Sequence, residues 1–193
     1  MISIAQLIPL ALALGWLMTV PAKGAPAVAS GVSTSGNIAW SVNPHNDDLM
    51  LVRAQGGGAP AKLCGVVSQA NVDVEFSPDD KYIFVTDGGS SLGVHVTLYR
   101  RSSGVQYTRV TSYDFDLAVQ RLAIKAETGK TIKGEVLDKS FLRCLGWSRD
   151  GRWALLQLSG RGTNNGKKVE ISGFRCAFNP YENLFTTDLK GLK

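Results

Sequence analysis

The sequence has few of the residues that carry enzyme chemistry. It contains 2 histidines and 3 cysteines among 193 residues. His45 and His95 stand in no metal-ligand spacing, and the cysteines lack the close pairs typical of zinc sites. Ser90 and Ser91 lie in the stretch TDGGSSLG, which lacks the strand-turn-helix context of a hydrolase nucleophile. The sequence therefore predicts no catalytic residue, no metal and no cofactor, and an unrecognised hydrolase is the remaining enzymatic alternative.

One short acidic cluster resembles a metal loop in composition only. Residues 45–48 read HNDD and offer oxygen and nitrogen ligands. They lack the spaced Asp-x-Asp-x-Asp-Gly series of calcium loops, and Pro44 precedes them. We interpret the cluster as a polar turn.

The first twenty residues, MISIAQLIPLALALGWLMTV, contain no charged side chain. Small residues follow, as in a secretory signal peptide covering residues 1–29, with cleavage after Gly24 or Ala29. An uncleaved membrane anchor is the alternative, since about 20 apolar residues span a bilayer. With cleavage, we expect no stable membrane insertion and a periplasmic or secreted protein.

The charge of the chain is mildly basic. The formal net charge is +5, and losing Lys23 with the leader gives +5 − 1 = +4. Most lysines and arginines are scattered along the sequence, which is unlike a nucleic-acid footprint. Residues 30–193 are the length of a single domain with one core.

A pattern of an aromatic residue, a polar turn and an apolar run recurs through the chain. It occurs as VEFSPDDKYIFVT (74–86), IAWSVNPHNDDLMLV (38–52), LGWSRDGRWALLQ (145–157) and CAFNPYENLFTT (176–187). The intervals are roughly 35 residues or twice that, which indicates a repeat architecture. Asp-Gly, Asp-Asp and Asn-Pro favour tight turns, so each copy predicts a β-hairpin.

The strands after these turns are apolar on both faces. Tyr82 to Val85 and Trp153 to Leu156 contain no polar residue at alternate positions. Strands buried on both faces belong to sheets that lie between other sheets. The pattern therefore favours stacked blades over a simple sandwich.

The stretches FSPDDKYI (76–83) and WSRDGRW (147–153) resemble the blade motif of TolB-like and WD40-like β-propellers. The resemblance implies an all-β fold. The length allows about four short antiparallel blades, in a small, incomplete or irregular propeller-like stack. Residues 114–127, DFDLAVQRLAIKAE, fit either one short helix ended by Gly129 or worn strands of a fifth copy.

Three cysteines in an oxidising compartment favour a disulfide. Cys144 and Cys176 precede equivalent aromatic residues of two copies, so neighbouring blades would bring them close, and we predict that they pair. Cys64, in the apolar stretch LCGVV, is then a buried free thiol.

Three glycine-rich segments follow the second strand of a copy, so we expect them on one edge of the stack. They are residues 55–60, 87–93 and 159–166. Loops at the rim of such a stack commonly carry recognition. The candidate partner-binding residues in the second and third segments are Gly88, Gly89, Ser90, Ser91, Leu92, Arg161, Asn164 and Asn165.

Two functional hypotheses follow. In size, export signal and partial propeller character, the chain resembles the small periplasmic immunity proteins that block peptidoglycan-cutting toxins delivered by type VI secretion. That resemblance implies a protein partner, a cell-wall hydrolase toxin, inhibited by insertion of the loop Gly88 to Gly93. The alternative is an envelope accessory domain that binds a glycan or small ligand on Trp40, Trp147 and Trp153. Open sheet edges also favour pairing of two copies as a homodimer.

Overall fold

The computed structural model of the chain describes residues 29–90, 93–110, 114–129, 137–164 and 166–192. Its described strands form a four-stranded sheet and an eight-stranded sheet. The eight-stranded sheet consists of two four-stranded meanders, so the chain has three successive four-stranded units, which we call blades. Blade 1 consists of β1 (Ser30–Val32), β2 (Ile38–Val42), β3 (Asp48–Arg53) and β4 (Ala61–Gly65). Blade 2 consists of β5 (Val72–Phe76), β6 (Tyr82–Ser90), β7 (Gly93–Ser103) and β8 (Gln106–Arg109), preceded by the short 3-10 helix η1 (Gln69–Asn71). Blade 3 consists of β9 (Leu137–Trp147), β10 (Ala154–Asn164), β11 (Lys167–Asn179) and β12 (Leu184–Thr186), and helix α1 (Asp114–Thr128) lies between blades 2 and 3 in the sequence.

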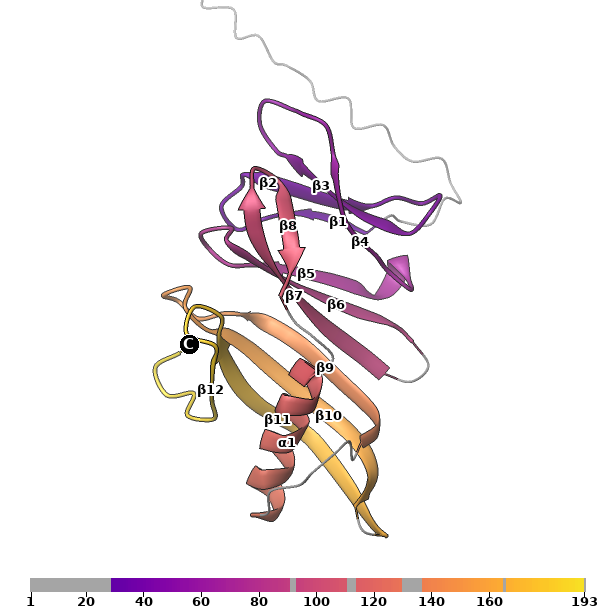
Figure 1. Cartoon of the computed structure of the whole chain (residues 1–193), viewed down its shortest axis with the longest axis vertical. Helices are drawn as coiled ribbons and strands as arrows, with labels where there is room; N and C mark the ends of the chain where they lie inside the picture. Colours follow the sequence, from indigo (N-terminus) through magenta and orange to yellow (C-terminus); the bar gives the residue numbers. More distant parts are fainter. Residues whose placement is uncertain (1–28, 91–92, 111–113, 130–136, 165, 193) are drawn as a thin grey trace, which may run out of the picture.

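Each blade is an antiparallel meander in which neighbouring strands in the sequence pair with one another. Blades 2 and 3 also join through a short parallel contact, where Gly93 pairs with Ser140 and Val94 with Phe141. Figure 1 shows the three blades following one another along the long axis of the molecule. The expected all-β, propeller-like stack with one short helix is confirmed, and its described part contains three blades.

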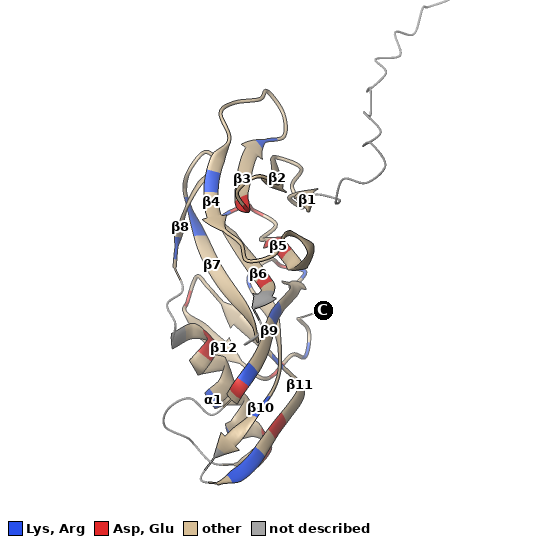
Figure 2. Cartoon of the chain, turned by 90° about the vertical axis from the view of Figure 1, so that its right-hand side faces the viewer, with Lys and Arg blue, Asp and Glu red and all other residues tan. Residues whose placement is uncertain are grey.

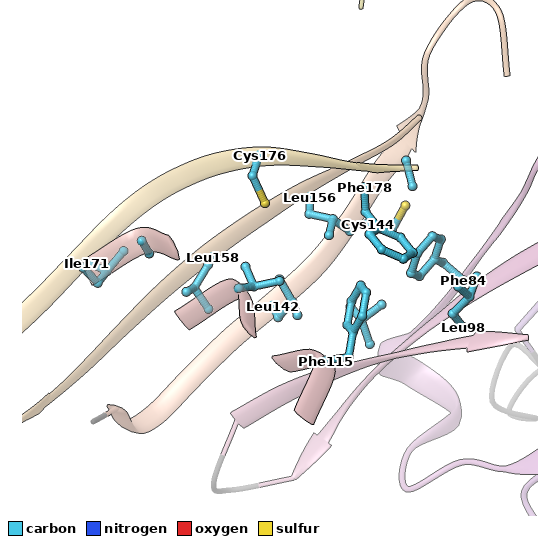
Figure 3. Packing of buried hydrophobic residues seen from close by; sticks show 14 of the residues in the cluster. Phe84, Leu98, Phe115, Leu142, Cys144, Leu156, Leu158, Ile171, Cys176 and Phe178 are labelled. Carbon is cyan, nitrogen blue, oxygen red and sulfur yellow. The ribbon is translucent and has the colours of Figure 1, made fainter. Parts of the chain in front are cut away.

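Blade 2 is the centre of the stack because both of its faces are buried. On β6, Tyr82, Ile83, Phe84 and Val85 are each at most 5% exposed, as the apolar run predicts. Ile83 and Val85 pack against blade 1 in one core. Tyr82 and Phe84 face a second core, which blade 3 and α1 complete. Figure 3 shows this second core, with Phe84 and Phe115 among side chains from β9, β10 and β11.

Residues 114–128 form a helix, which decides between the two alternatives that the sequence left open. Phe115, Val119 and Ala123 follow one another at four-residue intervals and are at most 9% exposed. This spacing places them on one helix face, which packs against blade 3. Gly129 ends the helix with φ +69° and donates its N–H to the carbonyl of Lys125 at 2.9 Å.

The same serine turn connects the first two strands of every blade. The serines are Ser33, Ser77 and Ser148, each at most 5% exposed. Each serine N–H donates to the carbonyl oxygen five residues later at 2.7–2.9 Å. The N–H of that later residue donates in turn to the serine Oγ at 2.9–3.2 Å. Backbone and hydroxyl groups that would otherwise be buried without partners are thereby satisfied.

Asp80 joins the serine turns of blades 1 and 2. Its φ is +56°, in the left-handed region that glycine occupies at the same place in the other two turns. The buried Asp80 carboxylate accepts hydrogen bonds from Ser35 Oγ and, at 3.4 Å, from Asn37 Nδ2. An aspartate at this position therefore provides a link between blades that glycine would not.

The structure revises the alignment of the repeat copies. The turn of blade 1 that matches the other two lies at residues 33–37, ahead of the predicted copy at 38–52, which forms β2 and β3. The predicted copy at 176–187 forms β11 and β12, so it is the outer hairpin of blade 3. These two segments share a different turn, in which Asn43 and Asn179 each accept an N–H from two residues later at 2.9 Å.

The predicted disulfide between Cys144 and Cys176 is wrong, because both thiols are free. The two cysteines pair with the same residue, Leu156, from opposite sides, so β10 lies between them. Two strand spacings separate them by about 10 Å, and a disulfide needs Cα atoms within about 7 Å. Cys64 is also free, as expected, although it is only partly buried.

The serine turn yields a test of stability. In Ser77→Ala, the N–H of Tyr82 loses its acceptor inside the protein, which costs about 1–3 kcal/mol of unfolding free energy. Urea unfolding followed by tryptophan fluorescence measures the loss. Ser103→Ala, at an exposed position of β7, is the control and should change the free energy by less than about 0.5 kcal/mol. Equal effects of the two substitutions would contradict the structural role of the turn.

The cysteines yield a test of the strand order in blade 3. Protein purified without reductant and unfolded in urea should titrate 3 thiols with Ellman's reagent. In the folded protein, burial raises the pKa of Cys144 and of Cys176 to about 12, so both should resist alkylation at pH 8. Cys64, which is less buried, should react first. Recovery of a single thiol after unfolding would show the disulfide and refute this strand order.

Candidate functional site

The described residues hold no group of three or more His, Cys, Asp or Glu side chains that could bind a metal ion. His45 lies exposed in the turn between β2 and β3, as the interpretation of residues 45–48 as a polar turn predicts. Burial raises the pKa of all three cysteine thiols, which opposes formation of a reactive thiolate.

His95 and Asp116 form a polar pair between β7 and α1. His95 Nδ1 lies 2.9 Å from Asp116 Oδ2, and the His95 side chain is 51% exposed. Burial raises the pKa of the Asp116 carboxyl, although the hydrogen bond from His95 acts to lower it. Within the described part of the chain, no serine, threonine or cysteine hydrogen-bonds to His95. The pair therefore holds α1 against β7 and does not form a nucleophilic triad.

The two glycine-rich segments 87–93 and 159–166, which we predicted to be long loops, are mostly strand. Gly88, Gly89 and Ser90 belong to β6, and Arg161 and Asn164 to β10. Ser91, Leu92 and Asn165 lie outside the described residues. The stretch containing Ser90 joins β6 to β7, so it has no helix after it.

Glycines of these two segments stand where neighbouring strands lie too close together for a Cβ atom. A Cβ on Gly160 would lie 2.7 Å from the carbonyl oxygen of Lys139. A Cβ on Gly93 would lie 2.1 Å from the carbonyl oxygen of Ser140. A strand glycine often marks such an approach of two backbones, which a sequence pattern does not distinguish from a flexible loop.

The three segments do not share one edge. Gly93 lies beside Ser140, which pairs with Gly160, so the second and third segments are close together. The segment 55–60 lies at the other end, because Ala54 donates its N–H to Asn37 in the serine turn of blade 1 at 2.9 Å. The expectation for residues 55–60 is wrong because the predicted first copy covered β2 and β3, one strand later than in the other blades.

A groove lies beside the β6–β7 hairpin, where blades 2 and 3 meet. Its volume is about 380 Å³. Asp73 on β5 and Arg143 on β9 place opposite charges in its lining. The same two strands also contact each other, since Trp147 Nε1 lies 3.5 Å from the carbonyl oxygen of Glu75. The lining residues are Asn71, Val72, Asp73, Thr86, Gly88, Val94 and Arg143.

The electrostatics of the groove are mixed. Neither Asp73 nor Arg143 belongs to the ion pairs of the described residues. Burial, followed by the nearby charge of Asp73, raises the pKa of Glu75 on the same strand. Groups of both signs are thus available to a partner beside Gly88, which is among the described lining residues of the groove.

The tryptophans do not form an exposed platform for sugars. Trp147 packs with its ring centroid 5.8 Å from that of Phe84. Trp40 packs against the core between blades 1 and 2, with its indole over Gly31. Trp153 is partly buried, and its backbone N–H donates to Ser148 Oγ.

Sequence reasoning missed the outer face of blade 3, which points away from α1. Phe141 and Leu145 on β9 are each 42% exposed, and Arg143 between them is exposed. The signal was present in the alternation of SFLRCLGW at residues 140–147, where every second residue is buried up to Cys144.

No protein-family model matches the chain, and no curated protein matches its sequence. Among solved structures, a putative TolB from Agrobacterium tumefaciens is 14% identical with a TM-score of 0.39, over 82% of this chain and 44% of that one. A periplasmic gluconolactonase from Pseudomonas aeruginosa is 13% identical with a TM-score of 0.41, over 81% of this chain and 47% of that one. The chain spans less than half the length of either protein. In its described part, no helix is long and apolar enough to cross a membrane.

The His95–Asp116 pair yields a test of pH dependence. A raised folded-state pKa means that the folded protein binds the Asp116 proton more tightly than the unfolded chain. This contribution to stability is complete below the ordinary value of 3.8 and is lost as pH rises through the raised pKa. Asp116→Asn cannot ionise, so its unfolding free energy should increase relative to wild type over that window, as measured by urea unfolding at stepped pH.

Asp150→Asn is the control for this experiment. Hydrogen bonds from Ser148 and from the Arg152 backbone lower the pKa of the exposed Asp150 carboxyl, so its contribution is lost as pH falls below 3.8. The two substitutions should therefore change the pH profile in opposite directions. Parallel profiles for wild type and Asp116→Asn would refute the buried, raised-pKa carboxyl.

Proposed function

We propose that the protein is an exported, non-catalytic binding module, and that the β6–β7 hairpin and the groove beside it contact a protein partner. The observation that carries this proposal is the support of the hairpin on both sides. Gly88 packs against Asn71, where a Cβ would lie 3.1 Å from the carbonyl oxygen, and Gly93 lies against Ser140. Backbone that is held at Gly88 and Gly93 before binding loses little conformational entropy there when a partner binds, which favours recognition.

We further propose that the partner is a peptidoglycan-hydrolysing toxin, and that the protein inhibits it by inserting this hairpin into the catalytic cleft. Glycosidases cleave sugar bonds with a pair of carboxylates, so such a cleft is acidic. Arg143 beside the hairpin and the net charge of +5 − 1 = +4 after leader removal complement that cleft. Ser90 and Ser91 supply hydroxyl groups that can hydrogen-bond to a catalytic side chain.

A second candidate function is the binding of a small polar ligand in the groove. The volume of about 380 Å³ falls within the range of roughly 300–1,000 Å³ for small-molecule sites. In this case the protein would act as an accessory domain of the cell envelope. Ligand binding would leave hydrolase activity unchanged, which separates the two functions.

Inhibition of a purified hydrolase tests the first function. The mature chain is added to each of a set of purified cell-wall glycosidases, and clearance of a cell-wall suspension is followed by turbidity. Wild type should suppress clearance, and Arg143→Glu should raise the concentration needed about tenfold because a charge-assisted contact is lost. Arg121→Glu, at an exposed position of α1, is the charge-matched control and should inhibit as wild type does. Absence of inhibition, or equal loss in the two variants, would refute the proposal.

A further inference from the structure

Blade 3 has one covered face and one uncovered face. Its inner face packs against α1 and blade 2 through residues such as Leu142 and Leu158, each at most 1% exposed. On its outer face, Phe141 and Leu145 are each 42% exposed. Among the described residues, no layer covers these two side chains of the outer face.

The outer face carries cations along three strands. Arg143 on β9, Arg161 on β10 and Arg175 on β11 are exposed. Gln157 pairs with Arg143 on one side and with Arg175 on the other, which brings the two arginines into one row across the sheet. None of the three arginines belongs to an ion pair of the described residues. Figure 2 shows basic positions along β9 and β11.

An apolar hollow lies next to this row. The C-terminal segment closes one side of it through Leu189 and is itself ordered by hydrogen bonds of 3.1 Å at Asp188 and Lys190. The volume of the hollow is about 110 Å³, well below the roughly 300 Å³ of the smallest common ligand sites, and it suits a single aliphatic side chain. The residues that line it are Leu145, Leu155, Leu156, Arg175, Cys176 and Leu189.

We propose that this hollow anchors a partner polypeptide through one aliphatic side chain with acidic side chains on either side of it. Arg175, which lines the hollow, binds one neighbouring carboxylate in a charge-assisted hydrogen bond. Arg143, in the same row across the sheet, continues the cationic surface and meets a further carboxylate. Arg161 lies farther along β10 opposite Glu170, so its charge is partly balanced and contributes less. A series of cations suits several acidic side chains along a chain better than the single carboxylate at a C-terminus.

The charge of this face opposes its pairing with the same face of a second copy. Face-to-face pairing would bring two sets of arginines together, and like charges across an interface are unfavourable. An aliphatic side chain held in a hollow, with hydrogen-bonding groups at its rim, is an arrangement that anchors an interface. The inference does not use the β6–β7 hairpin, and it holds whether or not the hairpin enters a hydrolase.

Binding of short peptides tests the proposal. The probe is an acetylated, amidated and fluorescently labelled peptide of sequence ESLSE, because alternate residues of an extended chain lie on one side. Three comparison peptides are KSLSK, ESSSE, and SSL with a free C-terminal carboxylate. In fluorescence anisotropy at low ionic strength, ESLSE should bind, KSLSK should not, and ESSSE and SSL should each bind at least tenfold more weakly.

Matched variants locate the site. Arg175→Glu and Leu145→Ser should each weaken ESLSE binding about tenfold. Arg121→Glu on α1 and Leu184→Ser on β12 replace residues of the same types at other exposed positions of the molecule, and should change the affinity less than twofold. In wild-type protein, amide chemical shifts of Leu155, Arg175 and Leu189 should move during the titration, which gives a measurement that requires no variant.

Several results would overturn the proposal. They are failure of ESLSE to bind, equal effects of the site and control variants, and shifts confined to other parts of the chain. Binding of SSL as tight as that of ESLSE would show that a C-terminal carboxylate is the ligand and would refute flanking acidic side chains. Arg175→Glu and Leu145→Ser leave Arg143 and the β6–β7 hairpin in place, and hydrolase inhibition is measured separately, so failure of one proposal is distinguishable from failure of the other.

Discussion

The burial of both faces of β6 is the constraint on which the rest of the structure depends. Ile83 and Phe84 are 0% exposed and point to opposite sides, so blade 2 requires a covering layer on each side. Blade 1 covers one side, and blade 3 with α1 covers the other. Blade 2 alone would expose both of these surfaces. The three blades should therefore fold as one cooperative unit, and truncation of either end should expose an apolar face of blade 2.

The serine turns supply the local geometry that this stacking requires. They place the start of each second strand at the same level, and contacts between the turns bind one blade to the next. A Cβ added to Gly151, in the turn of blade 3, would lie 3.1 Å from Pro78 in the turn of blade 2, so the two turns are in close contact. Tyr181, from the outer hairpin of blade 3, donates its hydroxyl to Asp79 at 2.9 Å. Although burial acts to raise it, hydrogen bonds from Ser77, Lys81 and Tyr181 lower the pKa of Asp79 to about 2.

The sequence predicted the blades because strand and turn chemistry are local. The apolar run from Tyr82 and the turns at Ser77 and Ser148 are readable without tertiary context. The register of blade 1 was not readable from an aromatic-led pattern, since Val32 stands where blades 2 and 3 have Phe76 and Trp147. A search for a serine followed three positions later by glycine or aspartate, the residues with positive φ in these turns, would have found Ser33.

The candidate site was harder to predict because it depends on which strands are neighbours. Glycines at 88, 93 and 160 indicate a loop in sequence. Only the packing of Asn71 against Gly88, and of β9 against Gly93 and Gly160, shows that they are contact positions. The cysteine prediction failed for a related reason. Equivalent starts of neighbouring blades would bring Cys144 and Cys176 together, whereas both belong to blade 3 with β10 between them.

The two ends of the stack differ in charge, and this difference bears on what can cover them. On blade 1, the exposed Lys62 is paired with Asp48 at 2.7 Å. The hollow around Met50 and Val52 is lined by no charged side chain among the described residues. On blade 3, Arg143 and Arg175 have no acidic partner in the described residues. Unpaired cations keep an exposed apolar face from associating with copies of itself, because their desolvation has no compensation in such a contact. An acidic partner supplies that compensation, so the same arginines that oppose self-association favour a protein of different charge.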